Sequence, residues 1–335
     1  MAERRGLRWG ILGCGNIAGK FARDLSSQDI PLAAAASRDA GRAGAFAREH
    51  GIARAYGGYE GVLADPRVDA VYVALPNHLH AEWSIRAARA GKHVLCEKPA
   101  SLYAGEARAM VDAARQAGVF FMEGFMYALH PQWGLARALL EEDAIGPLKR
   151  MEAVFSFDLG HRPGNIRLLP ETWGGALSDI GCYGLHFARS FGGGTPRIAK
   201  AQSRMGPEGV DEWTEAVLEF PGGAVASFAC GIREARPSLA VVEGERGRIE
   251  IPQPWHPPAQ GAEVRVTNGE GTSVYTAGDG LGAFVREARE VEEYAAAGQS
   301  PTLSWDDAIA QAEAMEAIRG MARLSQSEKG LGVRG

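Results

Sequence analysis

The feature that most constrains this chain is a glycine-rich turn close to its N-terminus. Gly13-Cys14-Gly15-Asn16-Ile17-Ala18 follows the pattern Gly-x-Gly-x-x-Ala and joins an expected strand at 7–12 to an expected helix at 17–25. Glycine lets the backbone turn sharply and approach a ligand closely, while the helix start offers unpaired N–H groups and a positive dipole end. The motif predicts a dinucleotide site, and the alternative in a glycine-rich chain is a plain tight turn.

The first third of the chain alternates short apolar stretches with helical patterns. Further strands are expected at 32–36, 70–74, 93–96 and 119–123, and helices at 40–49, 81–90 and 104–117. Such alternation is typical of parallel strands joined by right-handed crossovers. We therefore expect an α/β domain over residues 1–124, a Rossmann domain with a doubly wound parallel sheet that binds NADP.

After residue 124 the pattern changes to strands that follow one another. They are expected at 148–157, 198–205, 213–220, 224–231, 239–243, 248–251 and 264–267, with a hairpin turn at Pro221-Gly222-Gly223 and helices at 131–142, after Gly175, at 284–297 and at 306–324. Consecutive strands predict a mostly antiparallel sheet. Residues 125–335 are thus expected to form an α+β domain with a large open sheet that binds substrate and mediates oligomerisation.

Composition excludes several classes of protein. Lys and Arg total 36 against 41 Asp and Glu, a net charge of −5, so no general field attracts nucleic acid or acidic membranes. No apolar run approaches the ~18 residues of a membrane span, and residues 1–10 are too polar for a signal peptide. Four widely spaced cysteines lack zinc-site spacing. We expect a cytoplasmic protein with free thiols and no metal.

The end of the second expected strand indicates which dinucleotide is bound. An NAD site usually places a carboxylate there to hold the ribose 2′-hydroxyl, but this chain has Ser37 and Arg38. Arginine forms forked hydrogen bonds with phosphate oxygens, so the pair favours the 2′-phosphate of NADP over NAD. The alternative is that Arg38 is a surface residue paired with Asp39.

A lysine follows the expected strand at 93–96, in the segment Cys96-Glu97-Lys98-Pro99. Open α/β sheets bind their ligands at the carboxyl ends of the strands, which would place Lys98 against the nicotinamide. Glu97 could orient Lys98 or merely neutralise it, and Lys98 could instead be a solvated loop residue. Both histidines of the segment Leu75-Pro76-Asn77-His78-Leu79-His80 are interpreted as loop residues rather than metal ligands.

Together these motifs resemble the Gfo/Idh/MocA family of NAD(P)-dependent oxidoreductases. The segment 174–183, Gly-Gly-Ala-Leu-Ser-Asp-Ile-Gly-Cys-Tyr, is similar to a helix of that family's second domain, in which many members end on histidine. Tyr183 at that position resembles the branch with dimeric dihydrodiol dehydrogenase, glucose-fructose oxidoreductase and NADP-dependent xylose dehydrogenases. The resemblance implies cofactor contacts from Gly13, Gly15, Asn16, Ile17, Ser37, Arg38, Leu75, Pro76, Asn77, His80, Glu97 and Lys98.

The resemblance also implies the chemistry, with Lys98, Tyr183 and Asp179 as catalytic residues. Oxidation of a carbinol releases a hydroxyl proton, and a tyrosine of pKa ~10 accepts it near neutrality only with help from a cation. A lysine about 4 Å away contributes ~4 kcal/mol at an effective dielectric near 20, which is ~3 pKa units before desolvation. Asp179, four residues before Tyr183 on one helix face, could bind substrate, tune Tyr183 or cap its helix. Tyr183 alone could also be a core aromatic.

Substrate contacts are expected from Tyr127, Arg167, Trp173 and Asp179, which flank the cleft in the family. Aromatic rings with a few polar groups suit an aldose or a trans-dihydrodiol. Alternatives are a glucose-fructose-oxidoreductase-like enzyme that retains NADP, a non-catalytic NADP(H) sensor, and oxidative cleavage of a glycoside. An exposed apolar face on the antiparallel sheet, together with the resemblance, predicts a homodimer or higher homo-oligomer.

Overall fold

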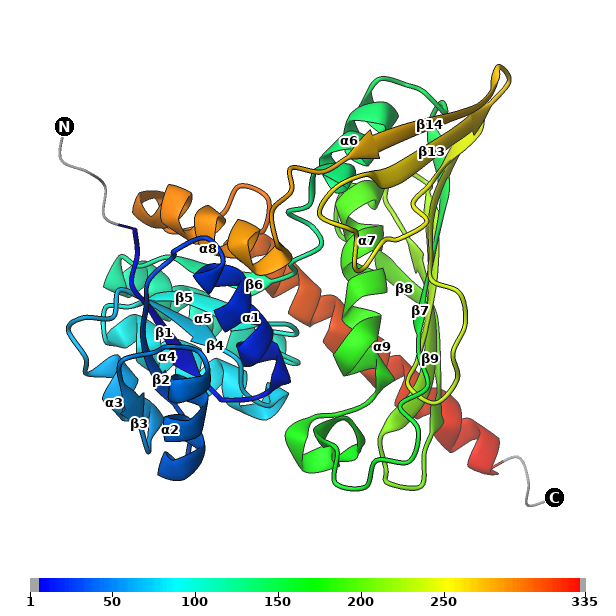
Figure 1. Ribbon diagram of the computed structural model, residues 1–335. Helices are drawn as coiled ribbons and strands as arrows, with labels where there is room; N and C mark the ends of the chain where they lie inside the picture. The colour runs from blue at the N-terminus through cyan, green and yellow to red at the C-terminus, as the bar shows by residue number, and fades with distance from the viewer. Residues whose placement is uncertain (1–5, 332–335) are drawn as a thin grey trace. The chain divides into compact units, whose positions relative to one another are not determined.

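The computed structural model describes residues 6–331, and these form two compact units. The first unit comprises the described chain up to Leu129 together with Leu281–Ile309, and the second comprises His130–Gly280 together with the chain from Ala310 onward. Each unit is therefore discontinuous (Figure 1). The expected division had a single boundary at residue 124 and placed 281–309 with the second sheet, because a helical pattern does not show which core a helix covers.

The first unit is built on a six-stranded parallel sheet in the order β3-β2-β1-β4-β5-β6. Its strands are β1 (Trp9–Leu12), β2 (Leu32–Ala36), β3 (Ala55–Tyr56), β4 (Ala70–Val73), β5 (His93–Glu97) and β6 (Phe121–Gly124). Its helices are α1 (Asn16–Ser26), α2 (Ala40–Glu49), α3 (Tyr59–Leu63), α4 (His80–Arg89), α5 (Ala104–Ala117), α8 (Ala283–Tyr294) and the beginning of α9 (Trp305–Leu331), with short turns η1 (Asn77–Leu79) and η5 (Ala295–Ala297). The predicted doubly wound sheet is confirmed.

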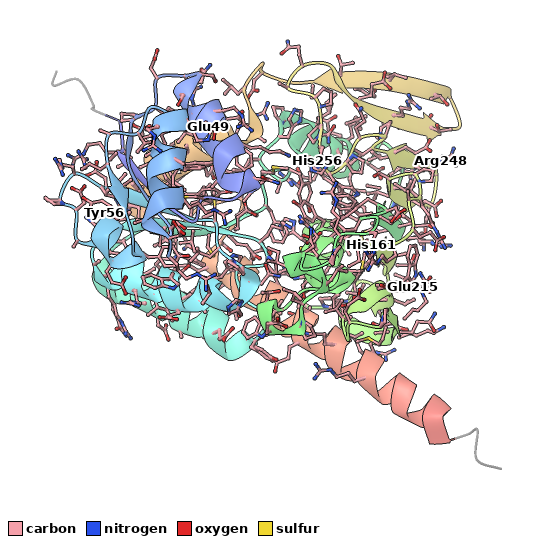
Figure 2. The ribbon with its side chains drawn as sticks, turned by 60° about the horizontal axis from the view of Figure 1, so that its bottom comes forward. Glu49, Tyr56, His161, Glu215, Arg248 and His256 are labelled. Carbon is pink, nitrogen blue, oxygen red and sulfur yellow. The ribbon has the colours of Figure 1, made fainter. Side chains whose placement is uncertain are left out.

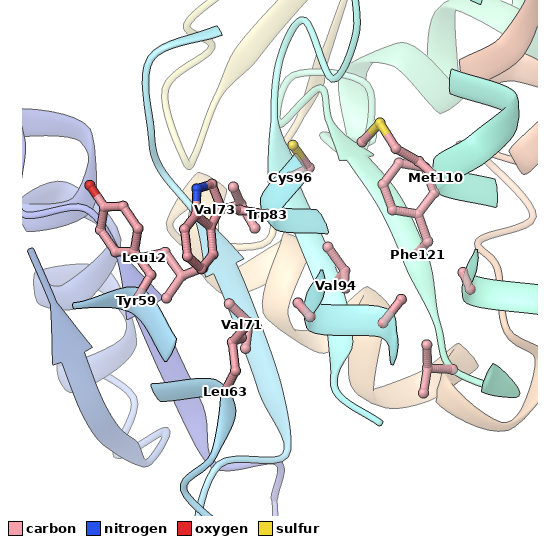
Figure 3. Close-up of a cluster of buried hydrophobic side chains, with 14 of the residues drawn as sticks. Leu12, Tyr59, Leu63, Val71, Val73, Trp83, Val94, Cys96, Met110 and Phe121 are labelled. Atoms are coloured by element: carbon pink, nitrogen blue, oxygen red, sulfur yellow. The ribbon is translucent and has the colours of Figure 1, made fainter. Parts of the chain in front are cut away.

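Both faces of this sheet are buried, which explains its continuous apolar strands. Val71, Val94 and Phe121 from three neighbouring strands pack with Trp83 of α4 and Met110 of α5 (Figure 3). On the α1 and α8 side, Tyr72 stacks on Phe21 with ring centroids 4.0 Å apart, and Phe284 of α8 meets both rings edge-on. Helix α8 therefore completes the hydrophobic core on one face of the six-stranded parallel sheet.

The second unit contains an eight-stranded sheet in the order β14-β13-β12-β11-β7-β10-β9-β8. Its strands are β7 (Leu148–Ser156), β8 (Arg197–Met205), β9 (Asp211–Glu219), β10 (Val225–Gly231), β11 (Leu239–Gly244), β12 (Gly247–Glu250), β13 (Ala262–Asn268) and β14 (Gly271–Ala277). Its helical segments are α6 (Pro131–Glu141), η2 (Ile166–Leu168), η3 (Pro170–Thr172), the π-turn η4 (Leu177–Gly181), α7 (Cys182–Gly192) and the rest of α9. Only β7 and β10 pair in parallel, so the expected mostly antiparallel sheet is confirmed.

The two faces of the second sheet differ in burial. Helix α7 packs on β7 and β10, where Met151, Ala153 and Phe228 are buried. Side chains on the alternate face are partly exposed, among them Val154 and Glu215. Figure 2 labels Glu215, which accepts hydrogen bonds from the indole of Trp213 (2.8 Å) and the amide of Gln202 (2.9 Å). Within the described residues, no helix combines the length and apolarity needed to cross a membrane.

Candidate active site

The glycine turn has the geometry expected of a phosphate-binding turn. Gly13 has a φ of +102°, and a Cβ there would lie 2.3 Å from the carbonyl oxygen of Ala74, so only glycine fits. A Cβ on Gly15 would meet no atom within 4 Å, which leaves open space in front of α1. No side chain within residues 6–331 is seen to cap α1, and its first turn has no acidic residue. The helix start is thus free to bind an anion.

Two arginines lie near the end of β2. Arg38 is exposed and interacts with the hydroxyl of Tyr59, whose pKa is raised by burial and lowered by Arg38. The carboxylate of Asp39 instead caps α2 by accepting the backbone N–H of Arg42 (2.8 Å). The Arg42 side chain donates to the Cys14 carbonyl from Nε (3.2 Å) and Nη2 (3.0 Å). Sequence analysis missed Arg42, which lies in the first turn of α2 shortly after Arg38.

The loop after β4 is joined to the segment after β5 by a buried histidine. The His80 ring places Nδ1 2.8 Å from the Pro99 carbonyl and Nε2 2.7 Å from the Leu75 carbonyl. Burial lowers the pKa of His80 to about 4, against the opposing effect of the two carbonyls; a neutral ring has one N–H and donates to one carbonyl, whereas a protonated ring donates to both. Because His80 is only 1% exposed, it links the two loops from beneath rather than lining an open surface.

The carboxyl end of β5 carries Glu97 and Lys98. The buried carboxylate of Glu97 accepts a hydrogen bond from the hydroxyl of Tyr72, whose ring is held between Phe21 and Phe284. Lys98 follows directly and is partly buried. Because β1 and β5 run parallel in one sheet, this lysine and the glycine turn lie at the same edge.

Helix α8 adds a second acid to this edge that sequence analysis did not single out. Glu287 is fully buried, and among the described residues neither of its carboxyl oxygens has a hydrogen-bond partner. A Cβ on Gly124 would lie 3.3 Å from Oε1 of Glu287 and 3.6 Å from Cα of Glu97. Burial and the charges of Glu97 and Asp24 hold the pKa of Glu287 well above its ordinary value. Glu287 follows Phe284 by three residues and precedes Val291 by four, so the helical spacing in the sequence already indicated that Glu287 lies on the buried face of α8.

In the second unit, the structure brings together two of the predicted residues. Nε of Arg167 lies 2.6 Å from Oδ2 of Asp179, whose side chain is 13% exposed against 41% for Arg167. The loop that carries Arg167 is fastened to the same turn, because the N–H of Gly175 donates to the Arg167 carbonyl (2.8 Å). Trp173 sits in this loop with a left-handed backbone, φ +57°. Tyr127 belongs to the first unit and is buried edge-on to Phe125.

Tyr183 stands in the first turn of α7, directly after the π-turn that carries Asp179. The expected regular helix over both residues is interrupted by this turn, so their spacing of four does not give the simple shared face of an α-helix. The Tyr183 ring is 5% exposed and packs edge-on against Phe155 (5.3 Å between centroids) and Trp255 (5.9 Å). Lys98 belongs to the first unit and Tyr183 to the second.

Comparison with known proteins relates both units to oxidoreductases. A family model described as an oxidoreductase family with an NAD-binding Rossmann fold matches residues 7–125, and one described as the GFO/IDH/MocA C-terminal domain matches 133–250. The chain is 38% identical over 258 residues to trans-1,2-dihydrobenzene-1,2-diol dehydrogenase of Mus musculus, covering 75% of this chain and 76% of that protein. It is 34% identical over 314 residues to D-xylose 1-dehydrogenase (NADP(+)) 2 of Haloferax volcanii, covering 93% and 96%.

Two solved structures are similar over nearly the whole chain. The 3-ketoreductase KijD10 of Actinomadura kijaniata, in complex with NADP and TDP-benzene, has a TM-score of 0.87 at 32% identity, covering 94% of this chain and 98% of that one. Aldose-aldose oxidoreductase of Caulobacter crescentus, complexed with glycerol, has a TM-score of 0.87 at 29% identity, covering 96% and 98%.

Proposed function

Because the chain belongs to the Gfo/Idh/MocA family of oxidoreductases and has an NAD(P)-binding Rossmann unit, we propose that it transfers a hydride between NADP and a carbinol of an aldose or a trans-dihydrodiol. The observation that carries this proposal is the carboxyl edge of the first sheet. There the uncapped start of α1 and the Glu97-Lys98 pair lie on one edge, as a dinucleotide with a reactive nicotinamide end requires.

The residues at this edge fit NADP. The open N-terminus of α1 at Gly15, Asn16 and Ile17 would bind the pyrophosphate beside Gly13. Ser37 and the exposed Arg38 would bind the 2′-phosphate, and Arg42 adds a second cation nearby. Leu75, Pro76 and Asn77 would border the nicotinamide half, next to Glu97 and Lys98, and the buried His80 would support this loop from beneath. When bound, the nicotinamide supplies or accepts the hydride.

Proton transfer would fall to the side chains of this chain. In our proposal Tyr183 accepts the hydroxyl proton in oxidation and returns it in reduction, while Lys98 stabilises the phenolate. The ion pair of Asp179 with Arg167 presents both acceptors and donors for the hydroxyls of a polyol, and Trp173 and Tyr127 supply apolar surface. The solved relatives include KijD10 variants in which a tyrosine or a lysine is replaced.

A second candidate is an enzyme that keeps NADP bound and exchanges electrons between two sugars. The similarity to an aldose-aldose oxidoreductase favours it. The two candidates differ in whether the cofactor leaves after each turnover. NADP retained by the purified protein through gel filtration supports the second candidate, whereas cofactor that must be added for every turnover supports the first.

The proposed function is tested with Tyr183→Phe on a panel of aldoses and dihydrodiols, following NADPH absorbance. Removal of the hydroxyl leaves the packed ring in place, so kcat should fall by ~10²–10⁴-fold while NADP affinity is unchanged. Tyr275→Phe, at an exposed position on β14, is the matched control and should keep full activity. Retained activity in Tyr183→Phe would remove Tyr183 as acid/base and direct attention to Asp179 or His186.

We also propose that the partner of this chain is a second copy of itself, bound through the open face of the second sheet. Leu239, Val154 and Ala229 lie side by side in register on β11, β7 and β10 and are all partly exposed. A row of apolar side chains across three central strands favours burial against another surface. Two-fold pairing of this face with itself would supply that surface.

A further inference from the structure

A carboxylate on β9 is bonded to the start of the π-turn that carries Asp179. Oδ2 of Asp211 accepts the backbone N–H of Leu177 (2.7 Å) and the hydroxyl of Thr214 (2.7 Å). Leu177 is the first residue of the π-turn, and the residue before it, Ala176, makes no side-chain cap. Asp211 therefore supplies, from a strand 34 residues away, the acceptor that an N-cap residue normally supplies from the adjoining position.

The turn is built to receive this carboxylate. Gly175 has a φ of +105°, and a Cβ on it would lie 2.1 Å from Oδ1 of Asp211, so any side chain at 175 would displace the acid. Gly175 is hydrogen-bonded both to the loop that carries Arg167 and to the turn that carries Asp179. Its N–H donates to the Arg167 carbonyl (2.8 Å), and its carbonyl accepts the N–H of Asp179 (3.0 Å). Asp211 is thus bonded to the turn at Leu177 and lies against Gly175, which is itself bonded to Arg167 and Asp179.

We propose that Asp211 is a positioning residue for the reaction, which fixes the turn over residues 174–181 so that Asp179 meets Arg167 and α7 presents Tyr183 in a productive orientation. The inference rests on the proposed function, since it assigns Asp211 a part in the chemistry of those residues. Asp211 acts through Leu177 and Gly175 rather than by touching substrate. Its carboxylate form is the active one, because an ionised carboxylate is the stronger acceptor for both donors.

The charge of Asp211 depends on pH in the physiological range. Burial raises its pKa to about 6, against the opposing effects of the Thr214 and Leu177 hydrogen bonds and the charge of Arg319 on α9. Cys230 on β10 is an ionisable neighbour, and its pKa is raised by burial and by the charges of Asp211, Cys182 and Asp179. Positioning should therefore weaken as the pH falls through about 6, giving the pH profile of kcat an acid limb there.

Substitution of Thr214 offers the sharpest test, because loss of its hydroxyl changes the pKa of Asp211 while the carboxylate itself stays in place. Thr214→Val deletes a hydrogen bond to the ionised form, so the acid limb of kcat should move upward by about one pH unit. Thr214→Ser keeps the hydroxyl and should leave the limb in place. NADP affinity, measured by fluorescence titration, should be equal in all three proteins, because the turn is not part of the nucleotide-binding unit.

Asp211→Asn provides a second test that does not use activity. The folded pKa of about 6 exceeds the unfolded value of ~3.9, so the wild type loses stability as the pH rises from about 4 to 6, while the asparagine variant does not titrate. The ratio of the folding equilibrium constants, wild type over variant, should fall about 30-fold between pH 4 and 6, and about 100-fold between pH 3 and 7, in urea titrations. Glu212→Gln, whose side chain instead pairs with Arg233, is the control and should show no such trend.

The outcomes of these experiments distinguish failure of the positioning role of Asp211 from failure of the proposed function. An acid limb that stays at one pH in wild type, Thr214→Val and Asp211→Asn overturns the positioning role, as does a wild type without a limb near pH 6. If Asp211→Asn does not fold, the valine and serine pair at Thr214 decides alone. If Tyr183→Phe is inactive but the limb does not move, only this inference fails. If Tyr183→Phe retains full activity, the acid/base role of Tyr183 fails, and if the wild type turns over none of the aldoses and dihydrodiols, the proposed function itself fails.

Discussion

Replacing Glu287 by glutamine should change how the stability of the protein depends on pH. The carboxyl is fully buried, has no hydrogen-bond partner in the part of the chain that the structure describes, and lies near the negative charges of Glu97 and Asp24. These surroundings raise its pKa, so the folded protein holds a proton that the unfolded chain releases above pH ~4.3. Unfolding then becomes easier as the pH rises from ~4.3 toward the folded pKa, by about 1.4 kcal/mol per pH unit.

Glutamine has the shape of the neutral acid but does not titrate. The difference in unfolding free energy, variant minus wild type, should therefore increase by about 1.4 kcal/mol for each pH unit within that window. Leaving a buried amide without partners adds a constant cost of ~1–3 kcal/mol, so the slope and not the absolute difference is the quantity to measure. At low pH the variant can be the less stable protein and at higher pH the more stable one.

The assay is urea unfolding of both proteins at half-unit intervals from pH 5 to 8. Glu293→Gln, an exposed position on the same helix, is the control and should follow the wild-type curve. Parallel curves for Glu287→Gln and wild type would show that Glu287 is already ionised in the folded protein. That result would refute the assignment of a neutral acid behind the Glu97-Lys98 pair.

Two further predictions concern the cofactor and the oligomer. Arg38→Ala removes a charge-assisted contact worth ~1.5–3 kcal/mol, so NADP affinity should fall by ~10- to 150-fold with little change for NAD in fluorescence titrations; equal loss for both would exclude the 2′-phosphate contact. Sedimentation at micromolar concentration should give a species of about twice 35.7 kDa, and Val154→Asp, in the apolar row of the second sheet, should shift it toward the monomer; a wild-type monomer would contradict the dimer.

Both sheets could be predicted from the sequence because their strands are marked by apolar runs or regular turns. The expected strand at 32–36 and the expected helices at 40–49 and 104–117 match the structure at both ends. Strand β3 and helix α3 were not expected, since Ala55–Tyr56 is two residues long and not fully buried, and Tyr59–Leu63 is a single turn. Strand β14 was also missed, because most of its side chains are exposed and carry no apolar alternation.

The apolar patterns of the last helices do not show which of the two sheets each helix packs against. The apolar spacing of α8 predicts a buried face but is equally compatible with either sheet. The structure joins α8 to the first unit through Phe284, which meets Phe21 and Tyr72. Helix α8 packs against this sheet because its side chains fit a core made of residues about 200 to 260 positions earlier in the chain. The sequence of the helix alone does not show that fit.

Two acids of the candidate site, Glu287 and Asp211, were not predicted because their surroundings come from distant parts of the chain. Motifs identify residues through their neighbours in sequence, whereas Glu287 and Asp211 are defined by what they contact in space. Each of these acids lies against a glycine: Oε1 of Glu287 is 3.3 Å from the Cβ position of Gly124, and Oδ1 of Asp211 is 2.1 Å from that of Gly175. A side chain at either glycine would crowd a carboxyl beside a proposed functional segment. The glycines were visible in the sequence, but their significance depends on acids that only the tertiary structure brings to them.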